Sequence, residues 1–95
     1  MTGERKEPKT GLRKAVALRY LPVQNSAPVV TAAGRGWLAE RIECLAREYR
    51  VPVIEDRTLA DVLSGLNPGE EIPEDLFEAV AVIFAFIMEA DRRQG

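Results

Sequence analysis

The sequence predicts an α/β fold, a small mixed β-sheet of three to four strands with about three helices packed around it. The chain has 95 residues, which fits a single domain. Short valine-rich runs are bounded by turn residues, as is typical of strands, and longer segments repeat apolar residues at helical spacing. We assign residues 14–93 to this one domain. Residues 1–13 are polar and basic, and we expect them to form a flexible N-terminal arm.

Two strands are predicted at the start of the domain. Residues 15–20 are apolar and end in tyrosine, and residues 28–32 are β-branched at their centre. The connection over residues 21–28 contains prolines and an Asn-Ser pair, and we expect antiparallel pairing across it. Gly34 and Gly36 are expected to end the second strand.

A helix over residues 37–49 and a third strand over residues 51–55 are predicted next. The helix repeats its large apolar residues on one face, at positions 38, 42, 45 and 49. Pro52 has no backbone N–H, so it should lie at the start of the third strand or on a sheet edge. The order strand, helix, strand predicts a right-handed βαβ unit. Cys44 lies beside the apolar face, and we expect it to be a half-buried filler.

Two further helices complete the expected fold. Thr58 should cap the start of a short helix that ends at Gly65. Pro73 should occupy the first position of the last helix. The expected core face of that helix consists of apolar residues at helical spacing, namely Leu76, Val80, Ile83 and Ile87, joined by Ala79 and Phe84.

Val82 and Phe86 lie toward the opposite side of the last helix, near Glu78 and Glu89. A small domain has few elements with which to cover two faces of one helix. We therefore expect Val82 and Phe86 to form a surface for a partner or for self-association. The alternative is burial under the short helix at residues 58–64 or under the C-terminal residues.

The composition argues against catalysis. The chain has no histidine and a single cysteine, Cys44, which excludes a Ser-His or Cys-His dyad, a structural zinc site and an internal disulfide. Adjacent acidic residues occur at turns and helix starts, where capping and solvation explain them. We expect no enzyme, no cofactor and no metal. The backbone amides of residues 34–37 leave an anion site as an alternative to a plain strand-to-helix turn.

Charge and hydropathy limit the location and the partners. The net charge of −2 gives no electrostatic case for nucleic acid. Residues 1–14 carry five basic and two acidic groups, while the rest of the chain is acidic. The N-terminus shows no apolar signal sequence, and the apolar stretch at residues 76–88 is shorter than the roughly 20 residues that span a bilayer. A cytoplasmic protein is expected.

Seven short runs occur in order along the chain, with x for positions outside the pattern: AVALRY (15–20), APVVTAAG (27–34), LAxxI (38–42), AREYRVPVIED (46–56), LA (59–60), GxxIPEDL (69–76) and AVAxxxAF (79–86). Together they resemble the cytoplasmic domain of the FlhB/YscU family, the export-switch proteins of bacterial flagella and type III secretion. Each run alone is a weak signal, whereas their order and spacing over residues 15–88 are specific. The resemblance implies the family fold, a mixed four-stranded sheet surrounded by helices.

One family feature is absent. The resemblance implies self-cleavage between Asn and Pro of an Asn-Pro-Thr-His motif just before the first strand. Here residues 10–13 read Thr-Gly-Leu-Arg, and Asn67-Pro68 lies far downstream, so we expect no self-cleavage. The membrane-embedded half of the family and the strand before the motif are also expected to be missing. The chain thus resembles a free-standing, FlhX-like equivalent of the fragment that cleavage releases.

The resemblance implies a non-enzymatic accessory or substitute module for flagellar or type III protein export. The expected partners are export-gate proteins or export substrates, including the membrane-anchored half of an export-switch protein. We expect no nucleic acid and no membrane insertion, weak self-association, and a location in the cytoplasm or at the periphery of the inner-membrane export gate. The alternative is a small cytosolic protein-interaction or anion-binding module unrelated to secretion.

Loss of the preceding strand should leave a sheet edge with unpaired backbone groups, at which a partner adds a strand. The expected binding residues are those of the first strand: Ala15, Val16, Ala17, Leu18, Arg19 and Tyr20. The alternative is that residues 9–14, or a helix, cover this edge.

Overall fold

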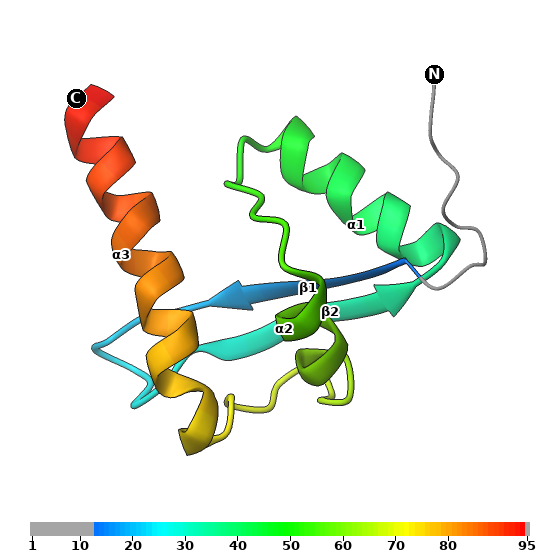
Figure 1. Ribbon diagram of the computed structural model, residues 1–95, viewed down its shortest axis with the longest axis horizontal. Helices are drawn as coiled ribbons and strands as arrows, with labels where there is room; N and C mark the ends of the chain where they lie inside the picture. Colours follow the sequence, from blue (N-terminus) through cyan, green and yellow to red (C-terminus); the bar gives the residue numbers. More distant parts are fainter. Residues whose placement is uncertain (1–12, 95) are drawn as a thin grey trace.

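The computed structural model describes residues 13–94. Its elements are β1 (Lys14–Arg19), β2 (Val29–Arg35), α1 (Trp37–Glu48), α2 (Arg57–Leu63), the 3-10 helix η2 (Glu74–Leu76) and α3 (Phe77–Gln94). The predicted α/β class is confirmed, with three α-helices around one sheet (Figure 1). The predicted strand number is too high, because the described sheet has two strands. Nearly all of the predicted arm lies outside the described residues.

β1 and β2 pair in antiparallel fashion, as the sequence predicts. The ladder begins where Lys14 pairs with Arg35. After Ala17 the register shifts, because Thr31 is an extra residue of β2. Such a bulge increases the local twist of the strand pair. Thr31 Oγ1 donates a hydrogen bond to the carbonyl oxygen of Ala17 (3.2 Å), which holds the bulge against β1.

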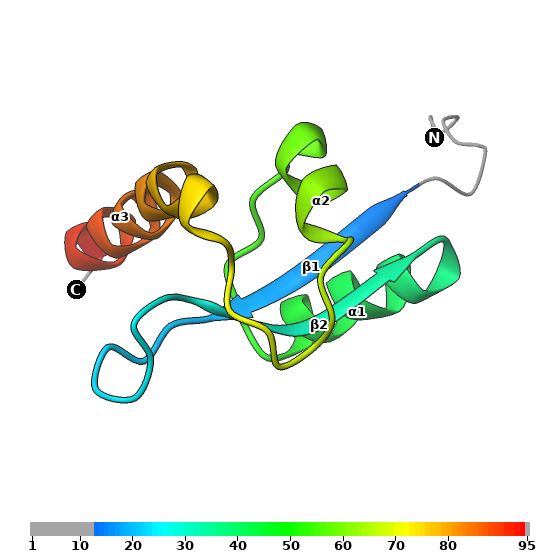
Figure 2. The same ribbon diagram turned by 90° about the horizontal axis from the view of Figure 1, so that it is seen from below.

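Different helices cover the two faces of the sheet. α1 packs on one face, and α2 lies over the other (Figure 2). The face toward α1 carries small residues from both strands: Ala15, Ala17, Ala32 and Gly34. Because these residues are small, α1 approaches the sheet closely, and Ala39 of α1 is fully buried.

Gly34 lies inside β2 and does not end it, because α1 leaves no room for a side chain there. A Cβ atom on Gly34 would lie 2.5 Å from Cγ of Leu38. Gly34→Ala should therefore lower the free energy of unfolding by about 1–3 kcal/mol in urea denaturation. In a Leu38→Ala background the same change should lower it by less than about 0.5 kcal/mol. An equal loss in both backgrounds would contradict the steric explanation.

The predicted third strand is wrong. Residues 51–56 are irregular and pass over the outer side of β1, from the face that α1 covers to the face that α2 covers (Figures 1 and 2). A segment that crosses an edge cannot pair along it, and Pro52 lacks a backbone donor. The predicted βαβ unit is therefore absent from the described chain. Besides the β1–β2 ladder, the only strand pairing within residues 13–94 is an isolated antiparallel bridge between Val29 and Glu71, at the β2 edge.

Three local details also differ from the prediction. Asp56 caps α2 in place of Thr58, since Oδ1 of Asp56 accepts a hydrogen bond from the backbone N–H of Leu59 (3.0 Å). Pro73 precedes the short 3-10 helix η2, and α3 continues from it. Cys44 is exposed, so the expectation of a half-buried filler is wrong.

The hydrophobic core lies between the sheet, α2 and α3. Its buried members are Ala27, Leu63, Ile72 and Val80, and partly buried side chains pack against them: Val16, Leu18, Leu59, Leu66, Leu76 and Phe84. α3 contributes the face that the sequence predicts, centred on Val80, except that Ala79 is exposed and does not belong to it. The C-terminal half of α3 extends away from the sheet (Figure 1).

Candidate functional site

The two edges of the sheet differ in how their backbone groups are paired. On the β2 side, the N–H of Val30 donates to the carbonyl oxygen of Glu70 (2.8 Å). The N–H of Gly69 donates to the carbonyl oxygen of Val30 (2.7 Å). The N–H of Ile72 also donates to the carbonyl oxygen of Pro28 (3.0 Å). Residues 69–72 therefore cover this edge. On the β1 side, the nearest chain is the irregular segment Val51 to Asp56.

The register shows which backbone groups of β1 point away from β2. The N–H of Gly36 donates to the carbonyl oxygen of Arg13 (2.8 Å), so the backbone groups of Arg13 face β2. In an antiparallel pair the N–H and C=O of one residue point to the same side, and the side alternates along the strand. The backbone groups of Lys14, Val16 and Leu18 therefore point outward. We call this row the open edge.

The segment of residues 51–56 borders the open edge without closing it. Among the described residues, no backbone hydrogen bond joins this segment to β1. Its apolar side chains are left in solvent, with Val51, Val53 and Ile54 exposed by 52%, 41% and 42%. Sequence reasoning missed this surface because it assigned residues 51–55 to a third strand of the sheet. Pro52 was the available signal, since a proline weakens any strand assignment.

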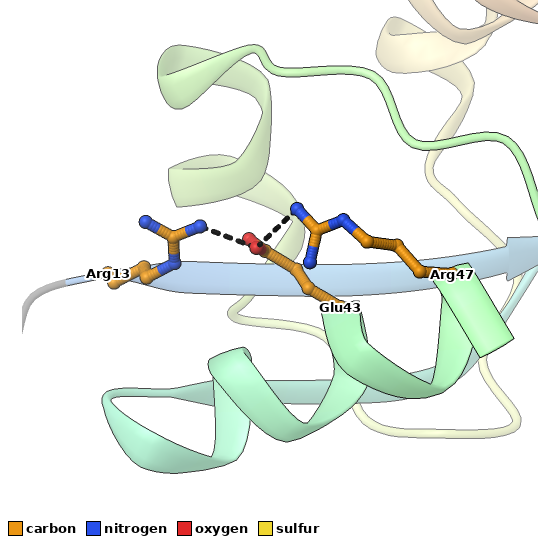
Figure 3. Close-up of polar contacts among 3 residues, drawn as sticks. All are labelled: Arg13, Glu43 and Arg47. Carbon is orange, nitrogen blue, oxygen red and sulfur yellow. Dashed lines mark hydrogen bonds and ion pairs between the residues drawn. The ribbon is translucent and has the colours of Figure 1, made fainter. Parts of the chain in front are cut away.

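Charged groups fix the start of β1 to the helices on both sides. Arg13 donates a hydrogen bond to Glu43 of α1, and Arg47 Nη2 lies 3.6 Å from the same carboxylate oxygen (Figure 3). On the other face, Lys14 Nζ lies 3.2 Å from Asp61 Oδ1 of α2. The hydrogen bond to Glu43 raises the pKa of the Arg13 guanidinium, against the opposing effect of its partial burial. These contacts hold the open edge in place.

Glu43→Ala should lower the free energy of unfolding by about 1 kcal/mol, because its side chain is only 16% exposed and serves two arginines. Arg47→Ala should lower it by less than about 0.5 kcal/mol, since the Arg47 side chain is mostly in solvent. Urea denaturation of both variants measures the difference. Equal losses would show that the Arg13 contact adds nothing to stability.

The sequence-predicted site residues fall on two separate surfaces. One surface is formed by β1, which contains Ala15, Val16, Ala17, Leu18 and Arg19 and is followed directly by Tyr20. Their backbone forms the open edge, although Ala15 itself is buried against α1. Val82 and Phe86 lie on α3 with exposures of 63% and 65%, as expected for a surface, and the alternative of burial under another element is wrong. Between β1 and α3, the ring of Tyr20 packs against that of Phe84, with centroids 6.2 Å apart.

The alternative anion site is weakened by the hydrogen bonds of its own amides. The N–H of Gly36 is used by Arg13, and that of Gly34 faces β1 in the ladder. Within residues 13–94, no group of three or more histidine, cysteine, aspartate or glutamate side chains is placed to bind a metal ion. No helix in this same range is long and apolar enough to cross a membrane.

The sequence pattern of the FlhB HrpN YscU SpaS family matches residues 12–87 of the chain. The chain belongs to this family. The expected family, that of the flagellar and type III export-switch proteins, is thus confirmed. The match begins beside the open edge and runs through most of α3, so it includes every element of the domain.

Relatives from this family fall into two size classes. An uncharacterized protein of Bacillus subtilis, YlqH, is 45% identical over 82 residues, which are 86% of this chain and 88% of YlqH. The flagellar biosynthetic protein FlhB of Helicobacter pylori is 40% identical over 81 residues, which are 84% of this chain. The chain spans only 22% of that FlhB. It therefore corresponds to a small part of FlhB and to nearly all of YlqH.

Solved structures from the FlhB family share the fold. The cytoplasmic domain of FlhB from Shewanella putrefaciens superposes with a TM-score of 0.81 at 32% identity, covering 86% of this chain and 64% of that one. A mutated EscU/SpaS C-terminal domain gives a TM-score of 0.78 at 35% identity, covering 81% and 96% of the two chains. The described fold is therefore that of the FlhB cytoplasmic domain.

Proposed function

We propose that this FlhB-family chain is a non-enzymatic accessory or substitute module of a flagellar or type III export apparatus. It works in the cytoplasm, or at the cytoplasmic side of the export gate, by binding an extended segment of a gate protein or export substrate. The membrane-anchored half of an export-switch protein is the first candidate partner. The family membership supports the apparatus, and the open edge supports the mode of binding.

The observation that carries this proposal is the contrast between the two sheet edges. Residues 69–72 pair with β2, whereas the outward groups of Lys14, Val16 and Leu18 have no backbone partner in the described chain. A partner strand placed there would satisfy these groups. It would also contact the exposed side chains of Val53 and Ile54, which gain from leaving water. Main-chain pairing would supply affinity, and these side chains would supply specificity.

The proposed binding requires no covalent step. Residues 10–13 read Thr-Gly-Leu-Arg, so the asparagine nucleophile implied by the family resemblance is missing. Asn67-Pro68 belongs to a turn in which Asn67 N–H donates to Glu70 Oε1 (2.6 Å). We expect one species of full-length mass after prolonged incubation of the purified chain. A fragment that begins at residue 68, or any other defined cleavage product, would contradict a purely binding role.

Co-purification from the native cell tests the proposed function. A tagged chain should retain export-gate proteins, and Val16→Pro should lose them, because proline removes an outward N–H of the open edge. Leu45→Ala is a matched control, since Leu45 lies on α1, on the other side of the sheet. Retention of no gate protein by the unmodified chain would overturn the proposed apparatus. Equal retention by Val16→Pro would overturn the open edge as the binding site.

A further inference from the structure

The cover that residues 69–72 give to the edge of β2 reaches as far as Val30. A turn precedes these residues, in which the N–H of Glu70 donates to the carbonyl oxygen of Asn67 (3.0 Å), so the chain does not continue along the strand. β2 itself continues to Arg35. A cleft of about 390 Å³ lies at this end of β2, bordered by the first turn of α1 and by the loop after α2. We call it the β2 cleft.

The end of β2 presents unpaired backbone groups beside the β2 cleft. The N–H of Gly36 donates to the carbonyl oxygen of Arg13 (2.8 Å), so Gly36 faces β1. Because the side alternates along a strand, Gly34 also faces β1, whereas the N–H and C=O of Ala33 and Arg35 point away from it. Within residues 13–94, these outward groups make no backbone hydrogen bond to another segment. They can therefore pair with an extended peptide.

The side chains around the β2 cleft combine one cation with apolar groups. Among the described residues that line it, only Arg35 is charged, and Arg35 forms no ion pair within residues 13–94. Its cross-strand neighbour Lys14 is paired with Asp61 (3.2 Å), so that carboxylate is occupied. Trp37 also lines the cleft and is 77% exposed. An unpaired guanidinium near an exposed indole favours a ligand with both a carboxylate and an apolar group.

We propose that the β2 cleft binds an extended acidic segment of another protein, which adds to the end of β2 as an antiparallel strand. Residues 69–72 already meet β2 in this direction, through the bridge between Val29 and Glu71. Two peptide residues pair with the backbone groups of Ala33 and Arg35. The peptide residue opposite Arg35 lies on the same face of the sheet, so an aspartate or glutamate there forms an ion pair with it.

The peptide residue that follows the acidic one lies opposite Gly34 and turns to the face that α1 covers. Gly34 has no side chain, and Trp37 and Leu38 border the cleft on this side, so an apolar residue fits there. The recognised segment is therefore an acidic residue followed directly by an apolar one. The β2 cleft lies on the edge opposite the open edge, so this inference does not depend on the proposed function.

The fluorescence of Trp37, the only tryptophan of the chain, tests the binding. The probe is the blocked peptide Thr-Glu-Val-Thr-Thr, and its matched control has Gln in place of Glu. The probe should change the emission of Trp37 with a dissociation constant between about 50 μM and about 1 mM. The control should bind about fivefold more weakly, because it lacks the ion pair. No saturable change up to about 5 mM probe, or equal binding of the two peptides, would overturn the inference.

A charge reversal tests the role of Arg35. Arg35→Glu should weaken binding of the probe about tenfold and should favour a peptide with Lys in place of Glu. Arg41→Glu is the matched control, since it makes the same charge change at an exposed position of α1 outside the cleft. It should leave binding within about twofold of the unmodified chain. With both variants folded by circular dichroism, equal losses would reduce the effect to net charge and overturn the ion pair.

Amide chemical shifts locate the bound peptide. The amides of Ala33 and Arg35 should shift as the probe is added, while those of Lys14, Val16 and Leu18 should stay in place. Shifts confined to the last three would put the peptide at the open edge and overturn the β2 cleft as its site. That result would leave the proposed function intact, so the two proposals fail separately.

Discussion

Replacing Ala17 by proline should destabilise the domain by about 3 kcal/mol, whereas replacing the neighbouring Val16 should destabilise it by about 1 kcal/mol or less. The difference follows from the direction of the backbone groups. Ala17 turns its N–H toward β2, so proline removes a ladder hydrogen bond there. Val16 turns its N–H to solvent at the open edge, so proline removes no ladder hydrogen bond there. The proline ring also has nearly the apolar volume of the valine side chain that it replaces. Urea denaturation of the two variants measures the contrast.

A steric control is needed because Ala17 also faces α1. Ala17→Val adds bulk toward α1 while keeping the N–H, so it separates crowding from the loss of the hydrogen bond. We expect it to destabilise less than Ala17→Pro. If Val16→Pro is as damaging as Ala17→Pro, the assignment of outward and inward groups on β1 is incorrect. The open edge would then involve the alternate residues of the strand.

Leu63→Ala should lower the free energy of unfolding by about 2–5 kcal/mol. Leu63 closes the last turn of α2 and is only 4% exposed, in contact with the buried cluster that includes Ile72 and Val80. Its truncation leaves a cavity among α2, α3 and the loop before α3. The surrounding side chains are closely packed, so they can refill that space only in part.

The neighbouring residue supplies the control for Leu63. Val62 lies on the same short helix but is 52% exposed, so Val62→Ala should change the free energy of unfolding by less than about 0.5 kcal/mol. Thermal or urea unfolding followed by circular dichroism measures both. A small effect of Leu63→Ala would mean that α2 is docked only weakly on the sheet. The fixed position of residues 51–56 beside the open edge would then be in doubt.

Features determined by local patterns were predicted well from the sequence. The hairpin of β1 and β2 follows from two short strand-like runs. α1 begins at the predicted residue because Gly36, with a φ of 63°, turns the chain from β2 into the helix. The inner face of α3 follows from helical periodicity, and the same periodicity placed Val82 and Phe86 away from the core.

Features that depend on the path of the chain in space were not predicted. Residues 51–55 have the composition of a strand, but the connection must pass from one face of the sheet to the other, so they cross β1 without pairing. Gly34 looks like a strand breaker by local rules, yet it is needed because Leu38 packs against it. Pro52 was the one local signal against strand pairing at residues 51–55. No local signal in the sequence reports the contact between Gly34 and Leu38.

The candidate site was predicted in part. The resemblance to the family suggested that β1 would have an uncovered edge, and the described chain has one. Which residues turn their backbone groups outward depends on the register, and the register became known only with the bulge at Thr31 and the contact between Gly36 and Arg13. Binding at this edge remains a prediction.

Amide hydrogen exchange, followed by NMR with and without the membrane-anchored half of an export-switch protein, tests the central claim most directly. In the free chain, the amides of Lys14, Val16 and Leu18 should exchange rapidly, while those of Ala15 and Ala17 are protected by β2. Added partner should protect the first three and leave the other two unchanged. Unaltered exchange at Lys14, Val16 and Leu18 in a saturated complex would contradict strand addition at the open edge.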